Sequence, residues 1–168
     1  RARKRIPIKI PAGVETGNRI QLSGQGEVGP GGGTSGDLYV EIVEIPHEYL
    51  LRDENNLHIS IAIPMSSAAI GTTVSIDTFD GPQKVEIKEG TQSGSTFTLK
   101  GLGVTRLRGG GRGDLIVHIE VVIPGKLTRE QTELMKKFAQ LRNEDGSKVI
   151  VHTNSDQGFF GKLRNAFR

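Results

Sequence analysis

The sequence contains no cysteine and no tryptophan, and only 5% of its residues are aromatic. Without cysteine there can be no disulfide and no thiolate metal site, and a reducing compartment becomes the default location. No apolar run approaches the roughly 20 residues that a membrane helix needs, and no signal-peptide pattern opens the chain. These absences lead us to expect a cytoplasmic protein without a membrane segment.

An excess of positive charge is found in only two places. The net charge is +3, but four of the 22 basic residues lie within residues 1–5, and the rest of the chain is close to neutral. A second, local cluster contains Arg106, Arg108 and Arg112. A dedicated nucleic-acid-binding protein normally has a broad basic face, so we do not expect nucleic acid as a partner.

The sequence shows no arrangement of residues that is typical of a catalytic or metal site. Each of the four histidines, His47, His58, His118 and His152, stands without a close Cys or His companion, whereas metal ligands converge and usually include one short spacing. The glycine-rich loops 29–36 and 109–113 lead into β-type sequence, whereas a phosphate loop leads into a helix. We therefore expect no enzyme, no metal and no cofactor in this chain.

An internal repeat is the strongest pattern in the sequence. At an offset of 77 residues, the spacing between Gly13 and Gly90, two segments match without a gap. The matched pairs include Gly17 with Gly94, Leu22 with Leu99, Gly24 with Gly101, Gly26 with Gly103, Gly36 with Gly113, Asp37 with Asp114, Leu38 with Leu115, Val40 with Val117 and Ile42 with Ile119. We interpret this pattern as a duplicated β-domain.

Each copy alternates apolar and polar residues, as strands with one buried face do. We expect a strand over residues 6–10, where Ile6, Ile8 and Ile10 alternate, and others that contain Ile20 and Leu22 and the segment 38–42. The second copy is preceded by further strand-like segments, 57–63 and 74–76, whereas only about six residues precede the first copy. If the duplication was complete, the first domain lacks its first hairpin here.

These patterns predict a mostly β fold with two tandem, similar, sandwich-like domains and a helical C-terminal tail. The expected bounds are 1–46 for the first domain, 47–127 for the second, 128–142 for a helix, and 143–168 for a loop and tail. Thr128 and Gln131 form a capping-box pattern at the start of that helix. In the tail, apolar residues recur every four positions, and we expect this surface to mediate homodimer contact; its residues are Phe159, Phe160, Leu163 and Phe167.

Several motifs resemble the part of bacterial DnaJ-type J-domain co-chaperones that follows their zinc-binding module. They are residues 8–17, 22–27, 36–40 and 47–57, followed in order by 68–71, 80–81 and 108–110. The resemblance implies a homodimeric co-chaperone that captures unfolded polypeptide clients and passes them to an Hsp70-class ATPase. It places client binding at Ile6, Ile8, Val40 and Ile42, contact with the acidic tail of the ATPase at Arg3, and dimerisation in the segment around Phe159 and Phe160.

The chain also departs from that family pattern. It has no His-Pro-Asp tripeptide, so the J-domain is absent, and zinc is expected only in the full-length family protein because this chain has no cysteine. Leu50 stands where many relatives have Phe. Two alternatives therefore remain: an architectural dimerisation module that binds no client, and a nucleic-acid-binding β-protein that uses Arg3, Lys4 and Arg5.

Overall fold

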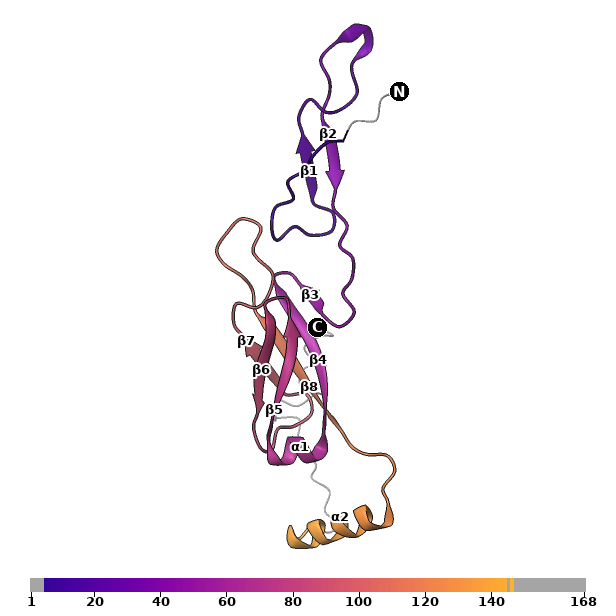
Figure 1. The fold of residues 1–168 in the computed structure, drawn as a ribbon, viewed down its shortest axis with the longest axis vertical. Helices are drawn as coiled ribbons and strands as arrows, with labels where there is room; N and C mark the ends of the chain where they lie inside the picture. Colours follow the sequence, from indigo (N-terminus) through magenta and orange to yellow (C-terminus); the bar gives the residue numbers. More distant parts are fainter. Residues whose placement is uncertain (1–4, 145, 147–168) are drawn as a thin grey trace, which may run out of the picture. The chain divides into compact units, whose positions relative to one another are not determined.

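A computed structural model describes residues 5–144 and 146 of the chain (Figure 1). Internal contacts divide the chain into two compact units, residues 1–123 and 124–168. The first unit contains the strands β1 (Arg19–Leu22), β2 (Leu38–Glu41), β3 (Leu51–Asp53), β4 (Asn56–Pro64), β5 (Thr72–Thr78), β6 (Gly81–Ile87), β7 (Thr96–Leu99) and β8 (Leu115–Val122). It also contains a short 3-10 turn, η1 (Pro30–Gly32), and the helix α1 (Met65–Ile70), whereas the helix α2 (Arg129–Leu141) belongs to the second unit. The prediction of a mostly β protein is confirmed.

The second repeat is built around a four-stranded sheet with the order β3-β4-β8-β7. Its two central strands, β4 and β8, run parallel, with Ile59 opposite Val117. The edge strands β3 and β7 pair antiparallel with their neighbours. β5 and β6 form a separate antiparallel hairpin, in which Val74 lies opposite Val85.

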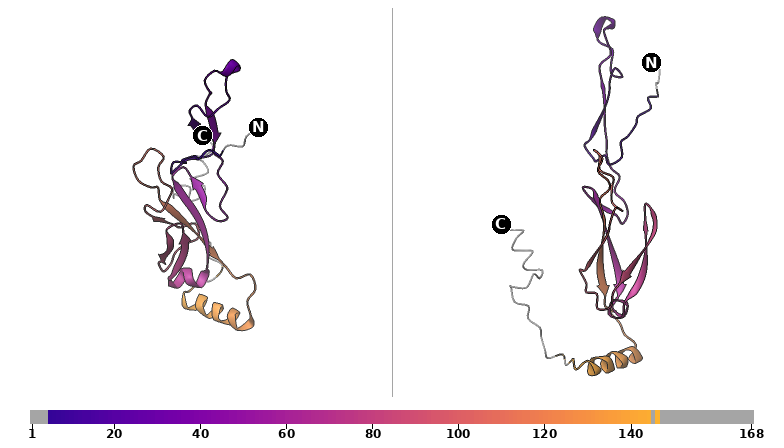
Figure 2. Two further views of the ribbon diagram at one scale, coloured as in Figure 1. Left: turned by 45° about the horizontal axis from the view of Figure 1, so that its top comes forward. Right: turned by 90° about the vertical axis from the view of Figure 1, so that its left-hand side faces the viewer.

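The hydrophobic core lies between the four-stranded sheet and the β5–β6 hairpin, which form two layers in Figure 2. Because side chains alternate across a strand, every second residue of β4, β6 and β8 points to this core. The buried apolar residues are Leu50, Leu57, Ile59, Ile63, Ala68, Ile76, Val85, Ile87, Leu115, Val117 and Ile119. All of them belong to the second repeat or to the segment that leads into it.

The first repeat contains β1 and β2, which pair with each other in a two-stranded sheet. Ile20 lies opposite Val40, and at the 77-residue offset Phe97 lies opposite Val117, so the two repeats have the same register. The loops agree as well, because the isolated bridge between Val28 and Ser35 has its counterpart in that between Thr105 and Arg112. The expectation that the strands of the two repeats occupy like positions is confirmed.

The prediction of a strand over residues 6–10 is wrong, because this segment has no regular secondary structure in the described chain. At the 77-residue offset its counterpart is β6, which is a strand because it pairs with β5. The counterparts of β4 and β5 would fall at or before residue 1. Alternating apolar residues form a strand only when a neighbouring strand satisfies their backbone groups, so residues 6–10 remain irregular.

The two helices follow local rules of helix formation. α1 has the sequence MSSAAI and ends at Gly71, whose φ of 90° is in the region that favours glycine. α2 begins after Thr128, whose side chain accepts a hydrogen bond from the Gln131 amide while Gln131 reaches back to the Thr128 amide. This arrangement confirms the predicted capping box.

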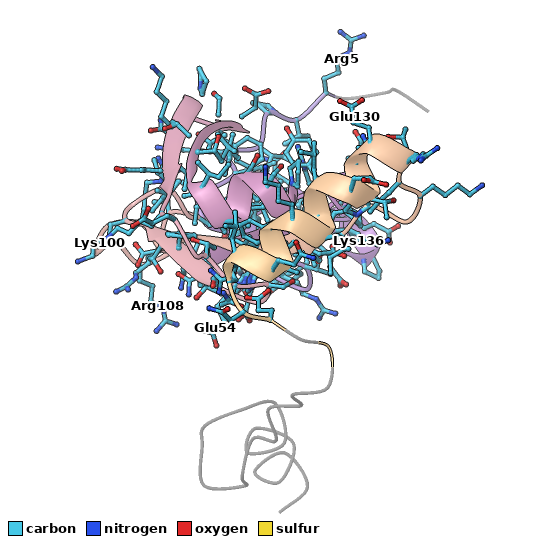
Figure 3. The ribbon with its side chains drawn as sticks, turned by 90° about the horizontal axis from the view of Figure 1, so that it is seen from below. Arg5, Glu54, Lys100, Arg108, Glu130 and Lys136 are labelled. Atoms are coloured by element: carbon cyan, nitrogen blue, oxygen red, sulfur yellow. The ribbon has the colours of Figure 1, made fainter. Side chains whose placement is uncertain are left out.

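Charged side chains point outward from both units (Figure 3). On α2, Glu130 and Lys136 project away from the helix, and in the first unit Lys100 projects from the turn after β7 and Arg108 from the start of the second glycine-rich loop. Arg112 of the predicted basic cluster is instead paired, because its Nη1 lies 2.8 Å from Oδ1 of Asp80. Of the three arginines in the predicted basic cluster, Arg112 therefore has its charge balanced by Asp80.

Candidate functional site

Within the described residues, the apolar strand of the first repeat has no covering layer comparable to that of the second. Val40 lies on β2 opposite Ile20, and Ile42 follows β2, where its amide donates to the Asn18 carbonyl and its carbonyl accepts from the Gly17 amide. Both side chains are half-buried. Their counterparts, Val117 and Ile119, are 0% and 2% exposed, because β4 and the β5–β6 hairpin cover them.

Ile6 and Ile8 lie in the irregular segment before β1. Ile6 is half-buried, and Ile8 is 38% exposed, whereas Val85, the counterpart of Ile8, is 4% exposed. At Ile8, Val40 and Ile42 the first repeat thus presents apolar side chains at positions that form the core of the second repeat. Exposed apolar strand residues beside a sheet edge can bind an extended peptide, with backbone hydrogen bonds for affinity and side-chain pockets for selectivity. We refer to Ile6, Ile8, Val40 and Ile42 as the first-repeat apolar surface.

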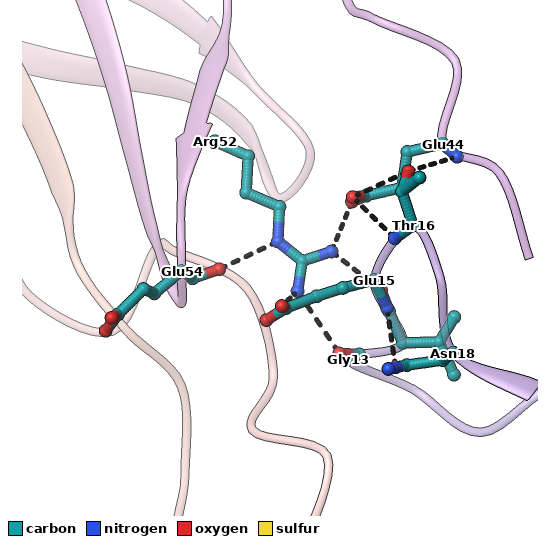
Figure 4. A network of polar contacts seen from close by, with 8 residues as sticks. Gly13, Glu15, Thr16, Asn18, Glu44, Arg52 and Glu54 are labelled. Carbon is teal, nitrogen blue, oxygen red and sulfur yellow. Dashed lines mark hydrogen bonds and ion pairs between the residues drawn. The ribbon is translucent and has the colours of Figure 1, made fainter.

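Arg52 on β3 connects the first repeat to the second (Figure 4). Its Nη1 donates to the Val14 carbonyl at 2.7 Å and its Nη2 to the Gly13 carbonyl at 3.1 Å. The same guanidinium pairs with Glu15 and Glu44. Its Nε donates to the Glu54 carbonyl at 2.7 Å, so the group is held from three sides. The planar donors of arginine make such a multiple contact possible, which lysine cannot reproduce.

Glu44 is the second anchor of this network. One of its carboxylate oxygens accepts a hydrogen bond from the Thr16 amide at 3.1 Å, and the other pairs with Arg52. The Thr16 hydroxyl accepts from the Glu44 amide at 2.9 Å, so the two residues are joined reciprocally. The Thr16 amide, which favours the charged carboxylate, is the largest cause that lowers the pKa of Glu44; Arg52 lowers it further, against desolvation.

A cavity of about 420 Å³ lies beside the Arg52 network. Its lining residues are Thr16, Glu44, Ile45, Pro46, His47, Leu50, Leu51, Arg52, Leu57, Phe79 and Val104. Leu50 is buried in the core, and the ring of His47 contacts the ring of Phe79 edge-on, with 5.4 Å between the ring centroids. Of the residues that link the two repeats, Leu50 is therefore packed in the core, whereas residues 43–49 are exposed.

Two of the histidines do have a close companion, contrary to the sequence-based expectation. The Nδ1 of His58 lies 2.8 Å from the Nε2 of His118, and the rings are stacked at 5.2 Å. They are 60 residues apart in sequence, but β4 and β8 are parallel neighbours, which places both on one face of the sheet. Within residues 5–144 and 146, no three metal-ligating side chains converge.

The remaining predicted site residues lie outside the described part of the chain. They are Arg3, expected to contact the ATPase tail, and the expected dimerisation residues Phe159, Phe160, Leu163 and Phe167. On α2, which is described, four large apolar residues at helical spacing are exposed; they are Leu134, Met135, Phe138 and Leu141. No described helix is long and apolar enough to cross a membrane.

Sequence reasoning missed Arg52 as a connecting residue. The motif that contains it, residues 47–57, indicated a link between the domains, but nothing in its composition shows which side chain makes the contact. The contact uses the backbone carbonyl groups of Gly13 and Val14, and every residue has such a group, so no pattern of residue types identifies these two. Only the folded loop turns them towards the guanidinium.

The DnaJ C terminal domain family matches residues 1–124, and the chain therefore belongs to this family. It is 53% identical over 167 residues to Chaperone protein DnaJ 2 of Streptomyces coelicolor. It is 51% identical over 169 residues to Chaperone protein DnaJ 1 of Nocardia farcinica and 45% identical over 168 residues to Chaperone protein DnaJ 2 of Mycobacterium tuberculosis. Each alignment covers 99% of this chain but 44% of the relative, so the chain spans less than half the length of the curated relatives it matches.

Proposed function

We propose that this chain is the client-binding part of a DnaJ-type co-chaperone, which holds unfolded polypeptide and delivers it to an Hsp70-class ATPase without doing chemistry itself. The observation that carries the proposal is the first-repeat apolar surface. Ile8, Val40 and Ile42 occupy positions that are buried core in the second repeat, yet in the first repeat they are exposed or half-buried. Family membership and the names of the relatives support the same role.

The binding mode follows from the chemistry of this surface. Unfolded polypeptide exposes apolar side chains and unpaired backbone groups, and the first repeat offers partly covered aliphatic side chains next to the two-stranded sheet β1–β2. Burial of an aliphatic side chain contributes about 1.5–3 kcal/mol when complete. Several such contacts without a required sequence would support binding of many different clients. This role requires neither a metal nor a cofactor.

The experiment is a titration of the full chain with a reduced, unfolded model protein, at two salt concentrations. We expect saturable binding that changes little with salt, and a Ile6→Ser/Ile8→Ser double variant that binds about tenfold more weakly, because two apolar contacts are lost. Val43→Ser is the matched control, since Val43 is a 72% exposed aliphatic residue near Ile42. Equal weakening by the control, or no binding by the unmodified chain, would contradict the proposal.

The same titration separates the two alternatives. A nucleic-acid-binding protein would bind a nucleic acid with an affinity that falls steeply as salt rises, because phosphate contacts release counterions. An architectural module would bind neither ligand. Contact of Arg3 with an acidic ATPase tail, homodimerisation through the tail that contains Phe159 and Phe160, and a cytoplasmic location are further parts of the proposal, and each stays a prediction.

A further inference from the structure

The turn formed by residues 13–18 holds one end of the first-repeat apolar surface. The Gly17 amide donates to the Ile42 carbonyl at 3.0 Å, and the Ile42 amide donates to the Asn18 carbonyl at 2.9 Å. The turn is closed by its own hydrogen bonds, since the Asn18 amide donates to the Glu15 carbonyl at 3.0 Å and the Glu15 amide donates to Oδ1 of Asn18 at 2.9 Å. The backbone position of Ile42 therefore follows the position of this turn.

The second repeat contains the same clamp between a turn and a strand. At the 77-residue offset, the Gly94 amide donates to the Ile119 carbonyl at 2.8 Å, and the Ile119 amide donates to the Ser95 carbonyl at 2.9 Å. The clamp is therefore part of the fold that the two repeats share.

The two repeats differ in charge beside this clamp. The first repeat has carboxylates at Glu15 and Glu44, whose counterparts in the second repeat are Gln92 and Val121. Because the second clamp forms without carboxylates at these positions, the shared fold does not require them. In the first repeat both carboxylates pair with the guanidinium of Arg52, which belongs to β3 of the second repeat.

Arg52 also holds the backbone of the turn, as Figure 4 shows. Its guanidinium donates to the Val14 carbonyl at 2.7 Å and to the Gly13 carbonyl at 3.1 Å. It holds the strand end as well, because Glu44 lies two residues after Ile42. One side chain of the second repeat thus fixes both halves of the clamp in the first repeat.

We propose that Arg52 is a positioning residue for client binding: it holds the turn 13–18, and the turn holds Ile42 at the end of the first-repeat apolar surface. Arg52 does not contact the client itself. Its contribution is preorganisation, because a surface that is already ordered loses less conformational entropy when polypeptide binds. The inference rests on the proposed function and deepens it, since it makes the client affinity of the first repeat depend on a residue of the second.

The first test is a titration of Arg52→Ala, as the full chain, with the reduced, unfolded model protein, at a temperature at which every variant is folded. We expect about tenfold weaker binding, which corresponds to the loss of one aliphatic contact. Arg52→Lys should weaken binding nearly as much, because an ammonium group cannot reproduce the planar set of donors. Arg19→Ala is the matched control, since Arg19 forms an exposed ion pair between β1 and β2 outside the turn, and its loss should leave the affinity unchanged.

A double-mutant cycle shows whether Arg52 acts through Ile42. The effects of residues that act through one another are not additive. Arg52→Ala should therefore weaken client binding about tenfold in the unmodified chain, but by less than about twofold in a chain that already carries Ile42→Ser. Equal weakening in both chains would overturn the proposal.

Hydrogen exchange separates positioning from general destabilisation. In Arg52→Ala the amides of Gly17 and Ile42 should exchange faster than in the unmodified chain. The amides of Gly94 and Ile119 form the same clamp in the second repeat and should keep their exchange rates. Faster exchange at all four amides, or at none, would show that Arg52 does not hold this clamp.

The double variant Glu15→Gln/Glu44→Gln keeps the proposal testable if Arg52→Ala does not fold. It removes both ion pairs of Arg52 but keeps the size of the side chains and the contacts with the two carbonyls. It should weaken client binding roughly threefold, the effect of partly exposed ion pairs. Unchanged client affinity in this variant would overturn the inference while client binding stands. Absence of binding by the unmodified chain would instead contradict the proposed function, and the exchange rates would still decide whether Arg52 holds Ile42.

Discussion

The Nη2 of Arg52 donates a hydrogen bond to the carbonyl oxygen of Gly13 at a distance of 3.1 Å. This bond joins β3 of the second repeat to the turn that opens the first, and Val14, Glu15 and Glu44 complete the contact (Figure 4). The loop that presents Gly13 is also packed closely against the second repeat. A Cβ added at Gly13 would lie 2.1 Å from the Thr105 carbonyl oxygen. Gly13 of the first repeat therefore contacts the second repeat twice, at Arg52 and at Thr105.

Arg52→Ala should lower the free energy of unfolding by about 2–3 kcal/mol, because several carbonyl and carboxylate acceptors lose a charged donor. The side chain is 19% exposed, so water replaces these bonds only in part. Arg19→Ala is the matched control, since Arg19 pairs with Glu41 at 3.1 Å but its side chain is 67% exposed. This substitution should lower the free energy of unfolding by less than about 1 kcal/mol. Urea unfolding of both variants checks the difference, and equal losses would contradict the assigned role of Arg52.

The Gly13→Ala substitution should destabilise the chain more than Gly17→Ala. Both glycines have φ near 90°, where a side chain costs roughly 1 kcal/mol. A Cβ at Gly17 meets open space, whereas one at Gly13 collides with the backbone of Thr105 and Leu107. We expect about 2 kcal/mol or more of additional loss for Gly13→Ala. Thermal unfolding of the two variants measures this difference, and identical midpoints would show that the Gly13 loop is not packed as described.

Leu38 and Leu115 are equivalent in the two repeats, but their different burial predicts that the same substitution destabilises the chain by different amounts. Leu115 is 0% exposed, and its counterpart Leu38 is half-buried. Leu115→Ala should therefore lower the free energy of unfolding by about 3–4 kcal/mol, because apolar burial is lost and a cavity remains. Leu38→Ala should lower it by about 1 kcal/mol. Chemical denaturation of the two variants compares them directly. Similar losses would mean that the first repeat is as well packed as the second.

Acid should weaken the contact between Thr16 and Glu44. The folded state lowers the pKa of Glu44, chiefly through the Thr16 amide, so the carboxylate binds protons less readily when folded than when unfolded. The resulting stability is present above the ordinary pKa of 4.5 and is lost as the pH falls through the lower, folded-state pKa. Glu44→Gln should reduce this acid sensitivity, and Glu41→Gln, which removes an exposed ion pair, should change it less. The free energy of unfolding is measured between pH 7 and pH 3 for each chain. The same pH dependence in Glu44→Gln and in the unmodified chain would contradict the prediction.

The apolar spacing of the tail predicts a homodimer. Phe159, Leu163 and Phe167 are spaced four apart, with Phe160 adjacent, and a self-complementary apolar patch favours a twofold contact. Phe160→Asp or Leu163→Asp should lower the mass in solution to that of a monomer and leave the β-strand signal in circular dichroism unchanged. Light scattering measures the mass, and a monomeric unmodified chain would show that the tail does not dimerise.

The sequence alone determined the features that depend on local spacing. The 77-residue repeat predicted the shared register of Ile20 with Val40 and Phe97 with Val117, because an unchanged loop length between matching strands preserves their pairing. Thr128 and Gln131 predicted the start of α2, because a helix cap is made by residues three apart. The mostly β class followed from the period-two alternation.

Only the tertiary structure decided the features that depend on neighbours from distant parts of the chain. Residues 6–10 have the alternation of a strand but remain irregular, because the strand that pairs with their counterpart β6 has no equivalent in the described chain. His58 and His118 contact each other across neighbouring parallel strands. They are 60 residues apart, so the sequence does not indicate that they are neighbours. Arg52 finds its partners largely among backbone carbonyls, which every residue possesses, so their positions follow from the fold and from no residue type.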